Sequence, residues 1–207
     1  DFTDTNSVSH MRIVDSDILT ILNAKAFKYA LTKDELYGYE AVAGILSYLK
    51  TFDLSKMPAG MAHYTSMKVM EKVAQVYDWC YDLLRPEDKY HIACAGTSKI
   101  CKFMEYPDFP PTGGGVMVGH MSGSIFLIAW ASMGIAIYDE YPEYYDLIEN
   151  IILDRLVPSQ NFMLSSGEHP QGSAYGVERF NMLLYGDMIF SAMFDNEIHL
   201  FDKESFH

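Results

Sequence analysis

The first segment whose residues could support chemistry runs from Gly113 to Ser124. It opens with three consecutive glycines and carries His120 just ahead of a long apolar run. Glycine lets the backbone approach a ligand closely, and histidine can exchange a proton near neutral pH. No Lys-Ser or Lys-Thr pair follows the glycines, so the segment is not a phosphate-binding P-loop. His120 is therefore a candidate acid–base or binding group, or else a structural side chain that caps the start of a helix.

The second segment, from Ser165 to Gly176, gathers polar and ionisable side chains in one stretch. They are Glu168, His169, Gln171 and Tyr175. Loops held by a rigid scaffold often carry catalytic groups, and this mixture of acids, bases and hydrogen-bonding groups is typical of an active site. The alternative is a solvated turn in which Tyr175 is a hydrophobic anchor.

Arg179 follows Tyr175 by about one helical turn. At that spacing the two side chains are neighbours on one side of a helix. A guanidinium group there could lower the pKa of the tyrosine or bind a sugar carboxylate. The alternative is an ion pair with Glu178 or with another surface acid.

The elements that position these residues are predicted to be helices, because helical periodicity recurs and strand patterns are scarce. The predicted helices cover residues 16–31, 35–51, 66–84, 86–106, 120–138, 143–156 and 175–194. Short turns join them into antiparallel hairpins, with irregular stretches over 107–115 and 159–173. The sequence therefore predicts an all-α protein with one domain over residues 1–207. Periodicity leaves a bundle, a solenoid and a toroid open.

Caps and breakers set the expected ends of these helices. Thr32 or Asp34 is expected to cap the helix 35–51. Pro86 suits the first turn of the fourth helix, where its missing N–H is not needed. The segment from Met57 to Gly60 is expected to interrupt the chain, and Pro158 to end the sixth helix.

Composition and charge narrow the possible functions. Of the 207 residues, 49% are hydrophobic and 14% aromatic, which excludes a disordered chain. The net charge of −13 argues against nonspecific nucleic-acid binding and against binding to an anionic membrane surface. It leaves an acidic substrate possible, because a cleft can carry a local field opposite to that of the whole molecule.

Cysteine spacing and hydropathy predict neither a metal site nor a membrane span. Cys80, Cys94 and Cys101 do not have the spacing of a zinc site or of a disulfide framework, so buried free thiols are expected. The longest apolar run, residues 125–138, is too short to cross a bilayer. No signal peptide precedes it, and the start at Asp1 predicts a piece excised from a longer protein.

Four motifs resemble those of heparinase II/III-like polysaccharide lyases. The first is Tyr77-Asp78-Trp79-Cys80-Tyr81-Asp82-Leu83-Leu84, followed by Pro86-Glu87. The others are Val118-Gly119-His120, the stretch from Gly134 to Pro142, and His169-Pro170-Gln171-Gly172-Ser173-Ala174-Tyr175-Gly176. They stand in the order of the family and span most of the chain from Tyr77 to Arg179.

The resemblance implies part of an incomplete (α/α) toroid, with a β-sandwich region downstream that this chain lacks. The implied activity is β-elimination on a uronic acid-containing polysaccharide, which requires neutralisation of the sugar carboxylate and a proton-transferring tyrosine. By position, Tyr175 matches the catalytic tyrosine and His120 the carboxylate end of the site. Substrate binding is expected of Glu168, His169, Gln171 and Arg179. The resemblance implies a periplasmic or secreted protein that needs no cofactor in this chain, with a structural metal only in the downstream region.

The chain departs from the family pattern at three places. Gly123 stands where the heparinase II pattern has an acid, and Gly119 where the heparinase III pattern has Asn. Carboxylate neutralisation could then fall to Gln171 or Arg179. A further catalytic His of the family has no counterpart before His207, so we expect this fragment to be nearly inactive by itself.

Two other functions remain open. A glycoside hydrolase on a similar toroid would need two carboxyl groups, Glu168 with Asp187 or Glu178. A glycan-binding module that kept the fold but lost the chemistry would account for the departures. The expected partner in each case is a polysaccharide or oligosaccharide, with no nucleic acid and no membrane insertion. The sequence leaves the oligomeric state open.

Overall fold

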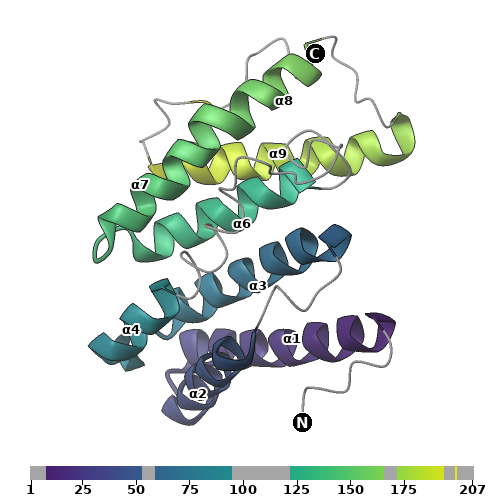
Figure 1. Ribbon diagram of the computed structural model, residues 1–207. Coiled ribbons are helices and arrows are strands. Elements are labelled where there is room, and N and C mark those ends of the chain that lie inside the picture. The colour runs from purple at the N-terminus through teal and green to yellow at the C-terminus, as the bar shows by residue number, and fades with distance from the viewer. Residues whose placement is uncertain (1–7, 53–58, 95–121, 166–171, 194–198, 200–207) are drawn as a thin grey trace. The chain divides into compact units, whose positions relative to one another are not determined.

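The computed structural model describes residues 8–52, 59–94, 122–165, 172–193 and 199 (Figure 1). Of the described residues, 87% are helical, and none of them lies in a β-strand. The predicted all-α class is therefore confirmed for this part of the chain. The arrangement of the hairpins as part of a toroid remains a prediction.

The helices occur in the predicted order, but some of them begin or end at residues other than those predicted. They are α1 (Val8–Thr32), α2 (Glu35–Thr51), α3 (Ala59–Trp79), the 3₁₀ turn η2 (Tyr81–Leu83), α4 (Pro86–Ala93), α6 (Ser122–Ile137), α7 (Pro142–Ile151), the π-helical η4 (Ile152–Leu156), α8 (Val157–Met163) and α9 (Ser173–Met193). The bounds of α2 are as predicted, and those of α6 and α9 agree within two residues. Residues 95–106 of the fourth predicted helix and the linker 107–115 lie outside the described residues.

Two helices begin well before their predicted starts. The first starts at Val8 rather than residue 16, because residues 8–15 contain neither Pro nor Gly to stop it. The third starts at Ala59 rather than residue 66, so the expected interruption does not include Ala59 and Gly60. Alanine is the strongest helix former, and one glycine costs only about 1 kcal/mol of helix propensity.

The chain divides into two compact units. One contains Asp1–Phe52 and Lys72–Ile92, and the other contains Asp53–Glu71 and Ala93–His207. The division falls within α3. A single domain over residues 1–207 stays a prediction.

In the first unit, a tight turn joins α1 to α2. Lys33 has a left-handed φ of 56°, and its N–H donates to the Tyr29 carbonyl at 2.7 Å, which ends α1. The next residue, Asp34, caps α2, since its side chain accepts a hydrogen bond from the Leu36 N–H at 3.2 Å. Of the two predicted caps, Asp34 rather than Thr32 is therefore the N-cap.

The two helices of this hairpin approach each other closely at two glycines of α2. A Cβ atom at Gly44 would overlap the Leu22 side chain of α1, and its distance to Leu22 Cδ1 would be 3.1 Å. A Cβ atom at Gly38 would lie 2.9 Å from Tyr29 Cγ. Leu22 and Tyr29 are both buried, so their side chains occupy the space that these glycines leave.

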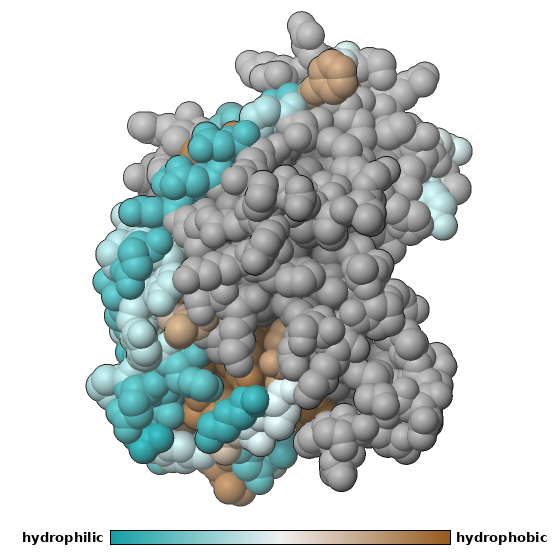
Figure 2. Space-filling model, viewed as in Figure 1, coloured by the Kyte–Doolittle hydropathy of each residue, from teal (hydrophilic) through white to brown (hydrophobic). Residues whose placement is uncertain are grey.

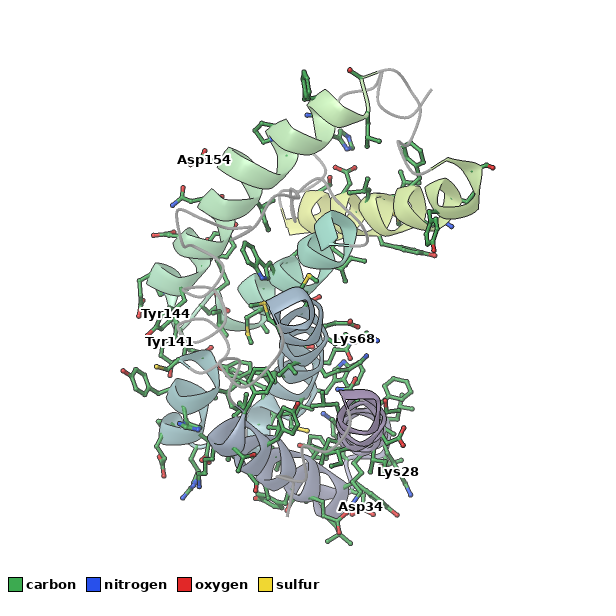
Figure 3. The ribbon with its side chains drawn as sticks, turned by 45° about the vertical axis from the view of Figure 1, so that its right-hand side comes forward. Lys28, Asp34, Lys68, Tyr141, Tyr144 and Asp154 are labelled. Carbon is green, nitrogen blue, oxygen red and sulfur yellow. The ribbon has the colours of Figure 1, made fainter. Side chains whose placement is uncertain are left out.

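The surface of the hairpin mixes charged and hydrophobic side chains (Figure 2). Lys25 forms an ion pair with Glu40 at 2.6 Å, and Lys28 Nζ lies 3.7 Å from the centre of the Tyr37 ring. Lys28 is labelled near the turn in Figure 3. Exposed hydrophobic residues of this surface include Leu31.

A bidentate ion pair holds the start of α4, which Pro86 opens as predicted. Arg85 Nε donates to Asp88 Oδ2 at 2.7 Å, and Nη2 donates to Oδ1 at 3.0 Å. The hydrogen bond from Arg85 lowers the pKa of the mostly buried Asp88 carboxyl below its ordinary value. An acid in the first turn also matches the positive end of the helix dipole.

In the second unit, α6 is apolar on almost every side, as the sequence predicts. Trp130, Met133 and Ile137 are fully buried. A short turn leads from α6 to α7, which continues through η4 into α8, and α9 then lies against α6 (Figure 1). In the part of the chain that the structure describes, no helix is long and apolar enough to cross a membrane.

The prediction that Pro158 ends the sixth helix is wrong. Pro158 is the second residue of α8, and the helix continues to Met163, so residues 159–163 are not irregular. A proline removes one backbone hydrogen bond and crowds the carbonyl four residues earlier. The wider π turn of η4, directly before α8, relieves that crowding by shifting the hydrogen-bond pattern.

Gly44→Ala is expected to lower the free energy of unfolding by about 1 kcal/mol. The added methyl group displaces Leu22, and overpacking costs about 1–3 kcal/mol, whereas alanine recovers only about 1 kcal/mol of helix propensity. Urea denaturation followed by circular dichroism measures the difference. Ser47→Ala, at an exposed position of the same helix, is the control and should be neutral or slightly stabilising. A Gly44→Ala protein as stable as the wild type would contradict the close approach.

The Asp88 carboxylate is expected to stabilise the fold above its ordinary pKa of 3.8 and to lose that effect in acid. Because its folded pKa is lowered, the unfolded chain takes up the proton first as the pH falls, and stability drops over that range. Asp88→Asn should therefore destabilise the protein at pH 7, by a margin that shrinks as the pH falls through the folded pKa.

Urea denaturation of both proteins from neutral pH to acid measures this margin. Glu87→Gln is the matched control, because Glu87 contacts the same arginine at 3.1 Å but is exposed. Exposed ion pairs contribute little to stability. A margin for Asp88→Asn that does not change with pH would rule out the ionised pair as its cause.

Candidate functional site

The structure places two of the six predicted site residues on α9. Tyr175 is in its first turn, and Arg179 follows one turn later. The side chain of Arg179 is not among those described. The other four, His120, Glu168, His169 and Gln171, lie outside the described residues.

The start of α9 presents Tyr175 to solvent. Gly172 has a φ of 73°, a left-handed conformation that glycine adopts without strain. Its carbonyl accepts a hydrogen bond from the Gly176 N–H at 2.8 Å, which fixes the first turn around Tyr175. The Tyr175 side chain is 43% exposed, so a ligand can reach it.

α6 and α9 start on the same side of their packed pair, and α9 extends further on that side. They contact each other and run in the same direction along the chain (Figure 1). α6 begins at Ser122, two residues after His120, and α9 begins at Ser173, two residues after Gln171. The two sequence segments that could support chemistry therefore lead into neighbouring helices from the same side.

A polar cluster that the sequence did not predict lies near the other end of α9. Asp187 Oδ2 and Ser191 Oγ are 3.4 Å and 3.5 Å from His199 Nδ1. Asp187 and Ser191 are one turn apart on α9, and Ser191 is buried while His199 is exposed. The sequence does show an acid and a hydroxyl four residues apart, which places both on one side of a helix. Nothing in the sequence indicates that His199 lies beside them.

This cluster does not have the geometry of a nucleophilic triad. In a Ser-His-Asp triad the serine and the aspartate contact opposite nitrogens of the imidazole ring. Here both contact Nδ1 of His199. The arrangement therefore attaches His199 to α9 and does not activate Ser191.

The first lyase-like motif forms the end of α3 and the turn after it. Tyr77 and Cys80 are fully buried, and the Trp79 ring lies 5.2 Å from that of Phe27 on α1. Tyr81 contacts Tyr77 edge-on at 6.1 Å. These residues pack the first unit, so their contacts account for this motif without a ligand.

The motif from Gly134 to Pro142 forms the end of α6 and the turn into α7. The Tyr138 and Tyr145 rings meet edge-on at 4.8 Å across this turn. Tyr141 and Tyr144, labelled in Figure 3, lie side by side at the start of α7 with ring centres 6.3 Å apart. Ring contacts thus stabilise the hairpin at this motif.

Burial makes three other acid–base candidates unsuitable as proton acceptors. It raises the pKa of Tyr29 and raises that of Cys80 to about 11. Burial and the nearby Glu149 raise the pKa of Tyr145 to about 12. All three groups therefore stay protonated near neutral pH. The prediction of buried thiols is confirmed for Cys80 and wrong for Cys94, which is only partly buried, and Cys101 lies outside the described residues.

The described residues contain no group of three or more His, Cys, Asp or Glu side chains that could hold a metal ion. Comparison with protein-family models and with curated proteins finds no match to the chain. The likeness to polysaccharide lyases therefore rests on the four motifs.

Gly172→Ala is expected to destabilise the start of α9 by about 1–2 kcal/mol, the cost of a left-handed conformation for a residue with a Cβ atom. No atom lies within 4 Å of the added Cβ, so strain is the only cause. Gly172→Asn is the matched variant and should lose less stability, because asparagine tolerates the left-handed conformation. Chemical denaturation compares the three proteins. Equal losses for Ala and Asn would show that the left-handed conformation is not the determinant.

Proposed function

We propose that the chain is the helical domain of a polysaccharide lyase that cleaves an acidic, uronic acid-containing glycan by β-elimination. The observation that carries this proposal is the position of Tyr175. It stands exposed in the first turn of α9, after a glycine turn and at the position of the catalytic tyrosine in the lyase-like motif. Buried tyrosines of the chain, such as Tyr29 and Tyr145, cannot meet a polymer.

The proposed chemistry divides between the starts of two helices. The C5 proton of a uronate becomes removable only when the adjacent carboxylate is neutralised, since that stabilises the enolate that forms. His120, directly before α6, is the proposed carboxylate-binding group, with Gln171 and Arg179 as further donors. Tyr175 then transfers the proton at C5, at the leaving oxygen, or at both.

The packing of α6 against α9 supports this division. Both helices run in the same direction, so their starts lie on the same side of the packed pair (Figure 1). A helix start also directs unpaired backbone N–H groups and a partial positive charge outward, which favours a carboxylate. Glu168 and His169, just before α9, complete the proposed binding segment.

The proposal also includes the fold, the domain organisation, the location and the partner of the protein. The toroid arrangement, the single domain and a periplasmic or secreted location follow from the same resemblance. The chain needs no cofactor for this chemistry, and its proposed partner is an acidic polysaccharide or oligosaccharide. Nucleic acid is not proposed as a partner, given the net charge of −13.

The hydrolase alternative is less well supported by the structure. It needs a second carboxyl group to face the scissile bond together with Glu168. Asp187 is mostly buried and faces His199, so its carboxylate already has a partner. The side chain of Glu178, the other candidate, is not among those described. The glycan-binding module remains the second candidate, because Gly119 and Gly123 replace polar groups of the lyase pattern.

Tyr175→Phe is expected to abolish elimination while binding is retained. The full-length protein is incubated with a panel of uronate polymers, and the unsaturated product is followed by its absorbance near ~232 nm. Removing one proton-transfer group typically lowers the rate by about 10²–10⁴-fold. Binding of the same polymer, measured by calorimetry, should change little because the ring is kept.

The control is Tyr185→Phe, a second exposed tyrosine on α9 whose hydroxyl should not matter. New reducing ends without absorbance would replace the lyase with a hydrolase. Binding with neither signal would favour the glycan-binding module. A Tyr175→Phe protein with wild-type activity would remove Tyr175 from the mechanism.

A further inference from the structure

We draw no further inference here: the strongest candidate, the surface patch of tyrosine rings and carboxylates at the turn between α6 and α7, is an acidic cluster whose ring contacts are explained by the packing of that turn, and nothing in the part of the chain that the structure describes shows what would bind there.

Discussion

Close approach of helices at residues without a side chain is the constraint on which the packing of the first hairpin depends. In the first unit the buried Leu22 side chain fills the space that Gly44 leaves. In the same hairpin, a Cβ atom at Gly38 would lie 2.9 Å from Cγ of the buried Tyr29. Each glycine costs about 1 kcal/mol of helix propensity, so tight contact must offset that loss. The turn before Tyr175 depends on a glycine in another way, because Gly172 there adopts a left-handed conformation.

The helices could be predicted from the sequence where a cap or a periodic pattern marks them. A cap at Thr32 or Asp34 and a regular apolar pattern predicted the bounds of α2, and the structure identifies Asp34 as the cap. Pro158 misled the prediction, because a proline inside a helix and a proline that ends one look alike in sequence. The difference lies in the five-residue π turn before it, a feature of the backbone that no residue type announces.

The candidate site could be predicted only in part. Tyr175, which follows a loop rich in acid–base residues, is exposed, while its catalytic role stays a prediction. Composition could not separate it from Tyr29 and Tyr145, which are buried and serve the packing. His199 could not be found at all. Its Nδ1 is 3.4 Å from Asp187 Oδ2, but His199 stands beyond the end of α9, where helical periodicity gives no information.

The distribution of charge limits which groups of the chain can bind the proposed acidic substrate. Several cations of the first unit already bind carboxylates of the chain: Lys25 binds Glu40, and Arg85 binds Asp88. A group held in this way offers little field to an acidic polymer, whose own carboxylate must displace an internal one. An acidic glycan would therefore depend on donors outside these pairs. In the proposed site those donors are His120, Arg179 and the starts of α6 and α9, which is where the chemistry must also occur.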